Sequence, residues 1–304
     1  MGDVGSVADY VALMKPRVMS LVVFTALVGL VMSPVAIHPV LAISAIILIA
    51  AGAGASAALN MWYDADIDAR MARTQNRPVA AGRISPDSAL SFGLWLAGLS
   101  VFSMAVLINY LSAALLAFTI FFYVGVYTIW LKRRTPQNIV IGGAAGALPP
   151  VIGWAAASPQ IGIEPLIEPL VFFAIIFFWT PPHFWALALL RNADYQAANV
   201  PMLPVMRGVR ATLWHIFAYA LVLAGVSQLP YVLGFSGLFY AAGAGVLNVI
   251  FVGLSVALLL AGQKQQKQEK RPVLARLAGL LFTYSIFYLF FIFVLLLADR
   301  LVIL

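Results

Sequence analysis

Long apolar runs alternate with short polar segments along almost the whole chain. Each run is roughly 20 residues long, the length that a helix needs to cross the hydrocarbon core of a bilayer. We predict about nine such helices, at residues 18–36, 39–60, 88–108, 111–131, 138–157, 166–190, 212–232, 237–262 and 277–298. The expected fold class is therefore an all-α integral membrane protein.

The composition agrees with a membrane protein and excludes a soluble one. Of the 304 residues, 63% are hydrophobic and 10% are charged, far from the averages of globular domains. Nothing resembling a soluble domain is left over, so we expect one transmembrane domain over 1–304, with 1–14 as a short cytoplasmic segment. The chain has no cysteine, which excludes disulfides, thiolate catalysis and iron–sulfur chemistry.

The basic residues lie almost entirely in alternate loops. Of the 18 lysines and arginines, only Arg300 falls on the opposite side of the predicted membrane, together with Glu164, Glu168 and Asp299. Positive loops stay cytoplasmic, so we expect the N-terminus inside and the C-terminus outside. With no transit peptide rich in arginine and serine, a bacterial inner membrane is the expected location. The net charge of +7 then reflects topology and contact with bilayer lipids, not nucleic-acid binding.

One acidic stripe stands at the end of the second predicted span. Asn60, Asp64 and Asp68 are four residues apart, so they share one helix face, whereas Asp66 should face elsewhere. The alternative is a polar helix end in the headgroup region, where charges cost little, but ionisable groups within the membrane are costly and tend to be functional. Oxygen ligands of this kind suit Mg²⁺ that also contacts substrate phosphates. We therefore predict a metal–diphosphate site.

Basic residues near this stripe are candidates for binding the diphosphate. Arginine presents a planar fork of donors that suits phosphate oxygens. The arginines that directly follow the aspartates are the first candidates, and those at the ends of the first and fourth spans are weaker ones, because topology also accounts for positive charge there. The predicted set is Lys15, Arg17, Arg70, Arg73, Arg77, Lys132 and Arg133.

Two further polar residues belong to the sixth span. His183 follows Pro181 and Pro182, which should interrupt the helix and free backbone groups. It could be a packing residue, a ligand of haem iron, or an acid/base near a reacting double bond. Asp194 is the carboxylate at the cytoplasmic end of the same span. We predict Asp64, Asp68, His183 and Asp194 as catalytic residues, and Asn60 with the three aspartates as the metal ligands.

These residues together resemble the UbiA-type family of intramembrane aromatic prenyltransferases. The resemblance extends from roughly residue 10 to residue 300. The motif Asn60-x₃-Asp64-x₃-Asp68 and the arginines that follow it carry the resemblance. The runs from Trp179 to Ala188 and from Val200 to Pro204 are similar to the branch that farnesylates haem. The resemblance implies helices around a central cavity, with Mg²⁺ and diphosphate at its cytoplasmic mouth. Many relatives carry a second Asp-x₃-Asp motif, which here is incomplete because Ala198 follows Asp194.

The implied reaction transfers the farnesyl group of farnesyl diphosphate to a vinyl group of haem B, with addition of water, to give haem O and diphosphate. Haem B is then a substrate, and a haem A synthase or a terminal oxidase is an implied partner. The alternative within the same family is a quinone precursor such as 4-hydroxybenzoate as the acceptor. A transporter is a further alternative, but it would need acidic residues across the whole membrane, whereas here they cluster at one end of the spans. A haem-sheltering assembly factor is another, but it would have no use for the acidic and basic residues at the cytoplasmic end.

Overall fold

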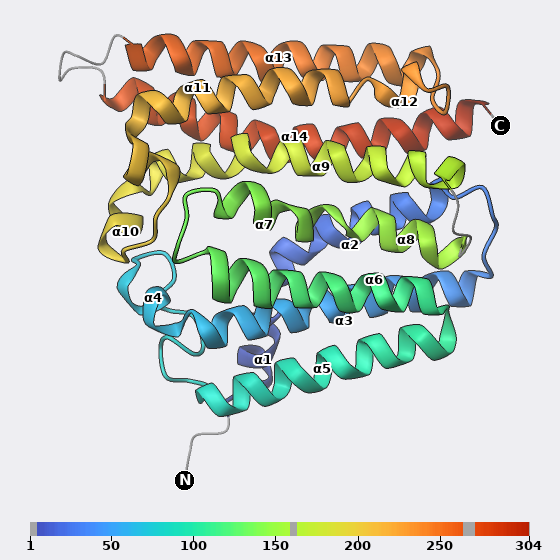
Figure 1. The fold of residues 1–304 in the computed structure, drawn as a ribbon, viewed down its shortest axis with the longest axis horizontal. Helices are drawn as coiled ribbons and strands as arrows, with labels where there is room; N and C mark the ends of the chain where they lie inside the picture. The colour runs from blue at the N-terminus through green and yellow to red at the C-terminus, as the bar shows by residue number, and fades with distance from the viewer. Residues whose placement is uncertain (1–4, 159–162, 264–270, 304) are drawn as a thin grey trace. The chain divides into compact units, whose positions relative to one another are not determined.

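The computed structural model describes residues 5–158, 163–263 and 271–303, and every element in these ranges is helical (Figure 1). In chain order the helices are α1 (Val7–Leu13), α2 (Pro16–Met32), α3 (Pro39–Tyr63), α4 (Ala65–Arg70), α5 (Pro86–Leu107), α6 (Tyr110–Phe121), the π-helical η1 (Phe122–Leu131), α7 (Asn138–Ala147), α8 (Pro149–Ala157), α9 (Ile163–Leu190), α10 (Asn192–Ala197), α11 (Leu203–Val226), α12 (Leu229–Val232), α13 (Leu238–Gln263) and α14 (Arg271–Ile303).

The predicted membrane helices are present. Within the described residues, 8 helical segments are long and apolar enough to cross a membrane, or 9 if α1 and α2, which meet at a bend of 53°, form one span. In three of these spans two consecutive elements run on from one another: α6 with η1, α7 with α8, and α11 with α12. The prediction of an all-α membrane protein is confirmed.

Contacts divide the chain into two compact units, and each is described by itself. Unit 1 consists of Met1–Arg134, Leu148–Gly162 and Ala197–Val200. Unit 2 consists of Thr135–Ala147, Ile163–Gln196 and Pro201–Leu304. Unit 1 therefore holds α1 to α6, η1 and α8, and unit 2 holds α7 and α9 to α14. The single domain over 1–304 and the central cavity stay predictions.

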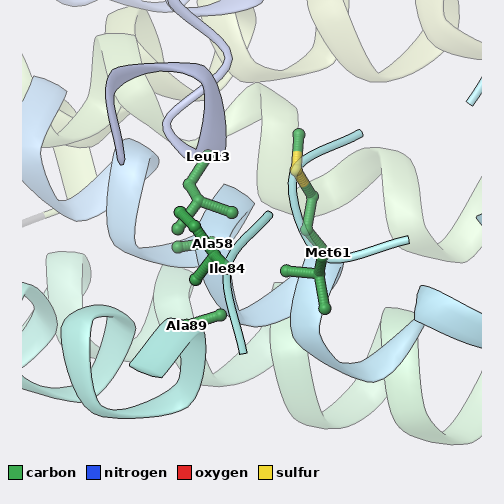
Figure 2. Packing of buried hydrophobic residues seen from close by; sticks show 6 residues of the cluster. Leu13, Ala58, Met61, Ile84 and Ala89 are labelled. Atoms are coloured by element: carbon green, nitrogen blue, oxygen red, sulfur yellow. The ribbon is translucent and has the colours of Figure 1, made fainter. Parts of the chain in front are cut away.

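A cluster of buried apolar side chains fixes the loop that follows α4 in unit 1. Figure 2 shows this cluster, in which α1, α3, α5 and the loop meet. Its members are Leu13, Ala58, Met61, Val79, Ile84 and Ala89. None of them is more than 7% exposed, so the loop is anchored beside the C-terminal end of α3. This is the end of α3 that carries the acidic stripe.

Helices α2 and α8 of unit 1 cross with their backbones in contact. A Cβ atom on Gly29 would lie 2.0 Å from the carbonyl oxygen of Pro150, and one on Gly153 would lie 2.0 Å from that of Ala26. Small residues are what allow membrane helices to approach this closely. The two glycines are thus packing residues.

In unit 2, α9 packs against α11 and α14, and α13 packs against the same two helices (Figure 1). A buried polar group joins α13 to its neighbours: Asn248 Nδ2 donates to Ser227 Oγ at 2.9 Å, and the Tyr288 hydroxyl donates to Asn248 Oδ1 at 2.7 Å. Asp299 accepts from the backbone N–H groups of Gly237 and Tyr240, which caps the start of α13. These bonds fix the register of α13 against α14.

The structure corrects one expectation about the sixth span. Pro181 and Pro182 lie inside α9, which continues through them from Ile163 to Leu190 without interruption. The Thr180 hydroxyl donates to the carbonyl oxygen of Ile176 at 2.8 Å, so a side chain is bonded to the backbone near the positions where the two prolines supply no N–H. The helix is held by its neighbours in unit 2, and packing of this kind overrides the preference of proline to end a helix.

Candidate active site

The acidic stripe lies where α3 meets α4. Asp64 is the joint between the two helices, with φ −91° and ψ 10°. Backbone bonds of helical spacing continue across the joint, from Asp64 N to Asn60 O at 3.0 Å and from Asp68 N to Asp64 O at 2.8 Å. The three side chains remain on one face and are 3%, 0% and 2% exposed for Asn60, Asp64 and Asp68. The predicted stripe is present, and its role in binding metal stays a prediction.

Both buried carboxylates of the stripe are paired with cations from other segments of unit 1. Lys132, which follows η1, donates from Nζ to Asp64 Oδ2. Arg77, in the loop after α4, donates from Nη1 to both oxygens of Asp68, at 2.9 and 2.8 Å. Charge-assisted bonds of this kind are the strong ones in proteins. The two predicted diphosphate-binding residues are thus brought to the aspartates.

The amide of Asn60 connects the stripe to a third cation and to η1. Its Oδ1 accepts from Lys15 Nζ at 2.8 Å, and its Nδ2 donates to Asp64 Oδ2 at 2.7 Å and to Thr128 Oγ1 at 3.1 Å. The Thr128 hydroxyl donates in turn to the carbonyl oxygen of Tyr123, five residues earlier. Thr128 is therefore a site residue that sequence reasoning missed. A single threonine in an apolar run gives little signal.

Lys15 has an unusual backbone conformation for its place in the chain. It stands between α1 and α2, outside both helices, with φ 54° and ψ 59°, directly before Pro16. A non-glycine residue in this left-handed region costs roughly 1–3 kcal/mol, and such residues cluster at functional sites. Burial, and then the positive charges of Arg77 and Lys132, lower the pKa of Lys15 to about 7. The three basic groups thus repel one another across the stripe, and a bound anion would relieve this repulsion.

Asp66 faces away from the stripe, as expected. Its side chain is 51% exposed and binds Arg133, whose Nη1 and Nη2 donate to the carboxylate at 2.9 and 2.7 Å. Arg133 also donates to the carbonyl oxygen of Tyr63 at 3.0 Å and lies 4.8 Å from the centre of its ring. The hydrogen bond from Arg133 lowers the pKa of Asp66 below its usual range. Arg133 is therefore fixed beside the stripe, and its role in binding diphosphate stays a prediction.

The remaining predicted diphosphate ligands of unit 1 lie further out. Arg17, Arg70 and Arg73 have exposed side chains, and Arg70 is in the last turn of α4. Exposed arginines at the end of a membrane helix also fit the positive-inside rule. Their assignment to diphosphate stays a prediction.

Asp194 lies in unit 2 on the short helix α10, which is separated from α9 by Arg191. The sequence predicted it at the end of the long helix itself. Its Oδ2 atom is buried and has no hydrogen-bond partner among the residues that the structure describes. A buried acceptor of this kind is costly unless a donor or a cation satisfies it. Its predicted role as a metal ligand stays a prediction.

His183 is a buried residue of α9, 8% exposed, in unit 2. Its ring stacks on Trp179 at 4.3 Å between ring centres and on Phe282 of α14 at 4.7 Å. Its Nδ1 atom lies 2.6 Å from the hydroxyl oxygen of Ser285, also on α14. Sequence reasoning missed Ser285, whose only signal is that it is a polar residue in a long apolar span.

The residues of the stripe fit a divalent cation. Asp64 Oδ1 is buried and has no hydrogen-bond partner in the described part of the chain, and Arg133 Nη2 is 3.8 Å from it. An ionised carboxylate oxygen can only accept, so a bound cation would satisfy it. In the described part of the chain, no three His, Asp or Glu side chains are gathered into a metal-binding group. A metal held by the stripe would therefore share its coordination with the substrate, as Mg²⁺ commonly does.

The chain is similar to known proteins in sequence and in fold. The sequence profile of the UbiA prenyltransferase family matches residues 22–286, which include all of α3, α4, η1 and α9. The chain belongs to the UbiA prenyltransferase family. The resemblance inferred from the sequence is confirmed.

Two similar relatives carry names that specify a reaction. A protoheme IX farnesyltransferase of Parvibaculum lavamentivorans is 56% identical over 301 residues, which cover 98% of this chain and 91% of the relative. The protein named protoheme IX farnesyltransferase 2 of Mesorhizobium japonicum is 58% identical over 294 residues, which cover 97% and 90%. The similarity thus runs over nearly the full length of both sequences.

Solved structures with the same fold are more distant in sequence. A structure of digeranylgeranylglyceryl phosphate synthase has a TM-score of 0.72 at 15% identity, and covers 94% of this chain and 98% of that one. A UbiA homolog from Archaeoglobus fulgidus bound to DMAPP and Mg²⁺ has a TM-score of 0.62 at 15% identity, and covers 92% and 99%. At such identities the likeness concerns the fold alone.

Proposed function

We propose that this protein transfers the farnesyl group of farnesyl diphosphate to a vinyl group of haem B. The allylic C–O bond of the donor breaks, a C–C bond forms to the vinyl group, and the hydroxyl of a water adds to the other vinyl carbon as the second water proton leaves. The products are haem O and diphosphate. The observation that carries the proposal is the buried acidic stripe with its three cations, in a chain 56% identical to a protoheme IX farnesyltransferase over 98% of its length.

The cations of unit 1 would bind the diphosphate. Lys15, Arg77 and Lys132 converge on the stripe, and each can exchange its present partner for a phosphate oxygen. Diphosphate is a poor leaving group unless its growing negative charge is stabilised, and fixed cations in a site that excludes water stabilise it most. The same exclusion of water protects the allylic cation from hydrolysis.

Asn60, Asp64 and Asp68 of unit 1 would hold Mg²⁺, and the proposal of Asp194 as a further ligand rests on the sequence alone. When bound, the metal supplies further neutralisation of the diphosphate charge as a Lewis acid. Asn60 Oδ1 accepts from Lys15 Nζ, which uses one of the two lone pairs of this oxygen and leaves the other for a metal. The support for a metal is Asp64 Oδ1, which is buried and accepts no hydrogen bond from the described residues.

The multi-pass arrangement and the positions of the basic residues support a location and an orientation in the membrane. We infer a bacterial inner membrane, an N-terminus in the cytoplasm, a C-terminus in the periplasm and a donor site at the cytoplasmic face, because all the basic residues except Arg300 fall on one predicted side. Haem O is consumed by haem-modifying or oxidase-assembly proteins, so a haem A synthase or a terminal oxidase is the expected partner.

Single aspartate-to-asparagine variants of the full-length protein, assayed in membranes, test the donor site. Asp64→Asn or Asp68→Asn should lower haem O formation by about 100-fold or more, because each removes a carboxylate that would hold the metal, and the metal neutralises the charge of the leaving group. Asp87→Asn is the matched control, since Asp87 is exposed in the first turn of α5 and should keep full activity. Undiminished haem O formation in both site variants would contradict the proposal.

A further inference from the structure

Ser285 makes three hydrogen bonds in unit 2, and two of them connect α9 to α14. Its carbonyl oxygen accepts from Trp179 Nε1 at 2.6 Å, and its hydroxyl donates to the carbonyl oxygen of Phe282 at 2.6 Å. The same hydroxyl oxygen lies 2.6 Å from His183 Nδ1. Both atoms that Ser285 presents to α9 are therefore engaged with the Trp179 and His183 side chains.

This network determines which nitrogen of His183 carries the proton. A serine hydroxyl has one proton, and a carbonyl oxygen can only accept. The hydroxyl proton therefore points to Phe282 O, and Ser285 Oγ must accept from His183 Nδ1–H. In the neutral ring the Nε2 atom then carries the lone pair.

The surroundings of the ring leave this lone pair available. Trp179 and Phe282 lie nearly parallel to the imidazole, with interplanar angles of 19° and 24°, and Phe184 meets it at 88°. None of the described residues hydrogen-bonds His183 Nε2. A metal binds imidazole nitrogen in the ring plane, so rings stacked on the faces fix the imidazole without blocking it.

We propose that Ser285 is a positioning residue that holds His183 in the Nδ1–H tautomer, so that Nε2 is presented to the iron of the haem substrate. The proposal rests on the proposed function, which supplies an iron porphyrin as the acceptor. Histidines that bind metals through one nitrogen almost always donate from the other, which fixes the ring and raises its basicity as a ligand. Loss of such a partner lowers metal affinity by about 10–100-fold.

The test is titration of the purified full-length protein with ferric haem B, followed by absorption and electron paramagnetic resonance. Ser285→Ala should weaken haem binding by about 10–100-fold and alter the iron signal, and Ser285→Thr, which keeps the hydroxyl, should restore both. Ser255→Ala is the matched control, because the Ser255 hydroxyl also donates to a carbonyl three residues earlier, that of Val252, on α13. This control should bind haem as the unchanged protein does.

Metal-free protoporphyrin IX separates iron ligation from loss of packing. Its binding should be the same in Ser285→Ala and in the unchanged protein, because it offers no iron to His183. Equal weakening for both porphyrins, or no weakening for haem, would overturn the proposal.

The spectrum of the unchanged protein is a further test that needs no variant: haem iron without an imidazole nitrogen ligand would also overturn it. Formation of haem O with such a spectrum would leave the proposed function standing, whereas failure to bind or farnesylate haem at all would refute that function itself.

Discussion

The Asp68–Arg77 pair joins a buried carboxylate to a partly exposed guanidinium. The side chain of Asp68 is 3% exposed, that of Arg77 is 21% exposed, and one nitrogen serves both carboxylate oxygens. Thr74 adds a further bond to this region, because its hydroxyl donates to the backbone carbonyl oxygen of Asp68 at 3.0 Å. The loop after α4 is thus held to the stripe by a charge and by a neutral bond.

Removal of Arg77 should therefore destabilise the protein. Arg77→Met leaves the Asp68 carboxylate buried without its partner, and we expect a loss of about 1–3 kcal/mol, since unpaired buried charge is costly but Arg77 is partly exposed. The measurement is thermal unfolding in detergent, with Arg73→Met, at an exposed arginine, as the control. Arg77→Met combined with Asp68→Asn should recover part of the loss, and a double variant as unstable as the single one would contradict this explanation.

The Asp66–Arg133 pair should make the stability of the folded protein depend on pH. The pKa of Asp66 is lowered in the folded protein, first by the hydrogen bond from Arg133, so the pair contributes stability above the unfolded pKa of about 4 and loses it as the pH falls through the folded pKa. Unfolding midpoints of the unchanged protein and of Asp66→Asn should differ at neutral pH and converge in acid. The expected difference is at most about 1 kcal/mol, because the carboxylate is half exposed. A gap that widens in acid would be inconsistent with the lowered pKa.

At the level of residues, the sequence predicted the features that depend on the spacing of residues close together in the chain. The spacing of Asn60, Asp64 and Asp68 predicted a common face, and Asp66 was predicted to lie off it. The partners could not be predicted, because Lys132 is 68 residues from Asp64 and the Thr128–Asn60 bond spans the same separation. Such pairs depend on helix packing, which periodicity does not encode.

At the level of elements, η1 and the junction of α3 with α4 determine which side chains surround the acidic stripe. In a π-helix the backbone bonds span five residues, and such segments are frequent at functional sites. The wider turn of η1 lets the Thr128 hydroxyl reach the carbonyl oxygen of Tyr123, while Lys132 follows at its end. The apolar run at 111–131 predicted a helix but gave no sign of its π-helical half.

The start of the chain shows a local signal that reasoning from apolar runs missed. Ser6 and Asp9 form a capping box at the N-terminus of α1, a pairing that marks helix starts. Residues 1–14 were expected only as a short segment before the first span. The continuation of α9 through Pro181 and Pro182 could not be predicted in the same way, because it depends on the packing of α9 in unit 2.

The α2–α8 crossing predicts different effects for two glycine substitutions in unit 1. Gly29→Ala would put a Cβ atom 2.0 Å from the Pro150 carbonyl oxygen, which is backbone and cannot rotate away. We expect destabilisation of about 1–3 kcal/mol from overpacking, measured as heat-induced loss of the monodisperse peak in size-exclusion chromatography. Gly98→Ala on α5 is the control, because nothing lies within 4 Å of its new Cβ atom, and there alanine should be neutral or stabilising. Equal behaviour of both variants would refute this account of the crossing.

At the level of the whole molecule, length and apolarity were sufficient to predict the membrane class and the spans. The division into two units was not predictable, because consecutive segments α7 and α8 belong to different units. The acceptor half of the reaction is also less visible in the sequence than the donor half. Charged groups mark the proposed diphosphate site, whereas the proposed haem contact, His183, is one polar residue among aromatic rings.

The central claim is that haem B is the acceptor of a farnesyl group. The most direct measurement is chromatography with mass detection of the products formed by membranes that contain the protein, given haem B, farnesyl diphosphate and Mg²⁺. We predict haem O together with diphosphate, and loss of both when a chelator removes the metal. Release of diphosphate with 4-hydroxybenzoate as acceptor, and no farnesylated haem under any condition, would contradict the claim.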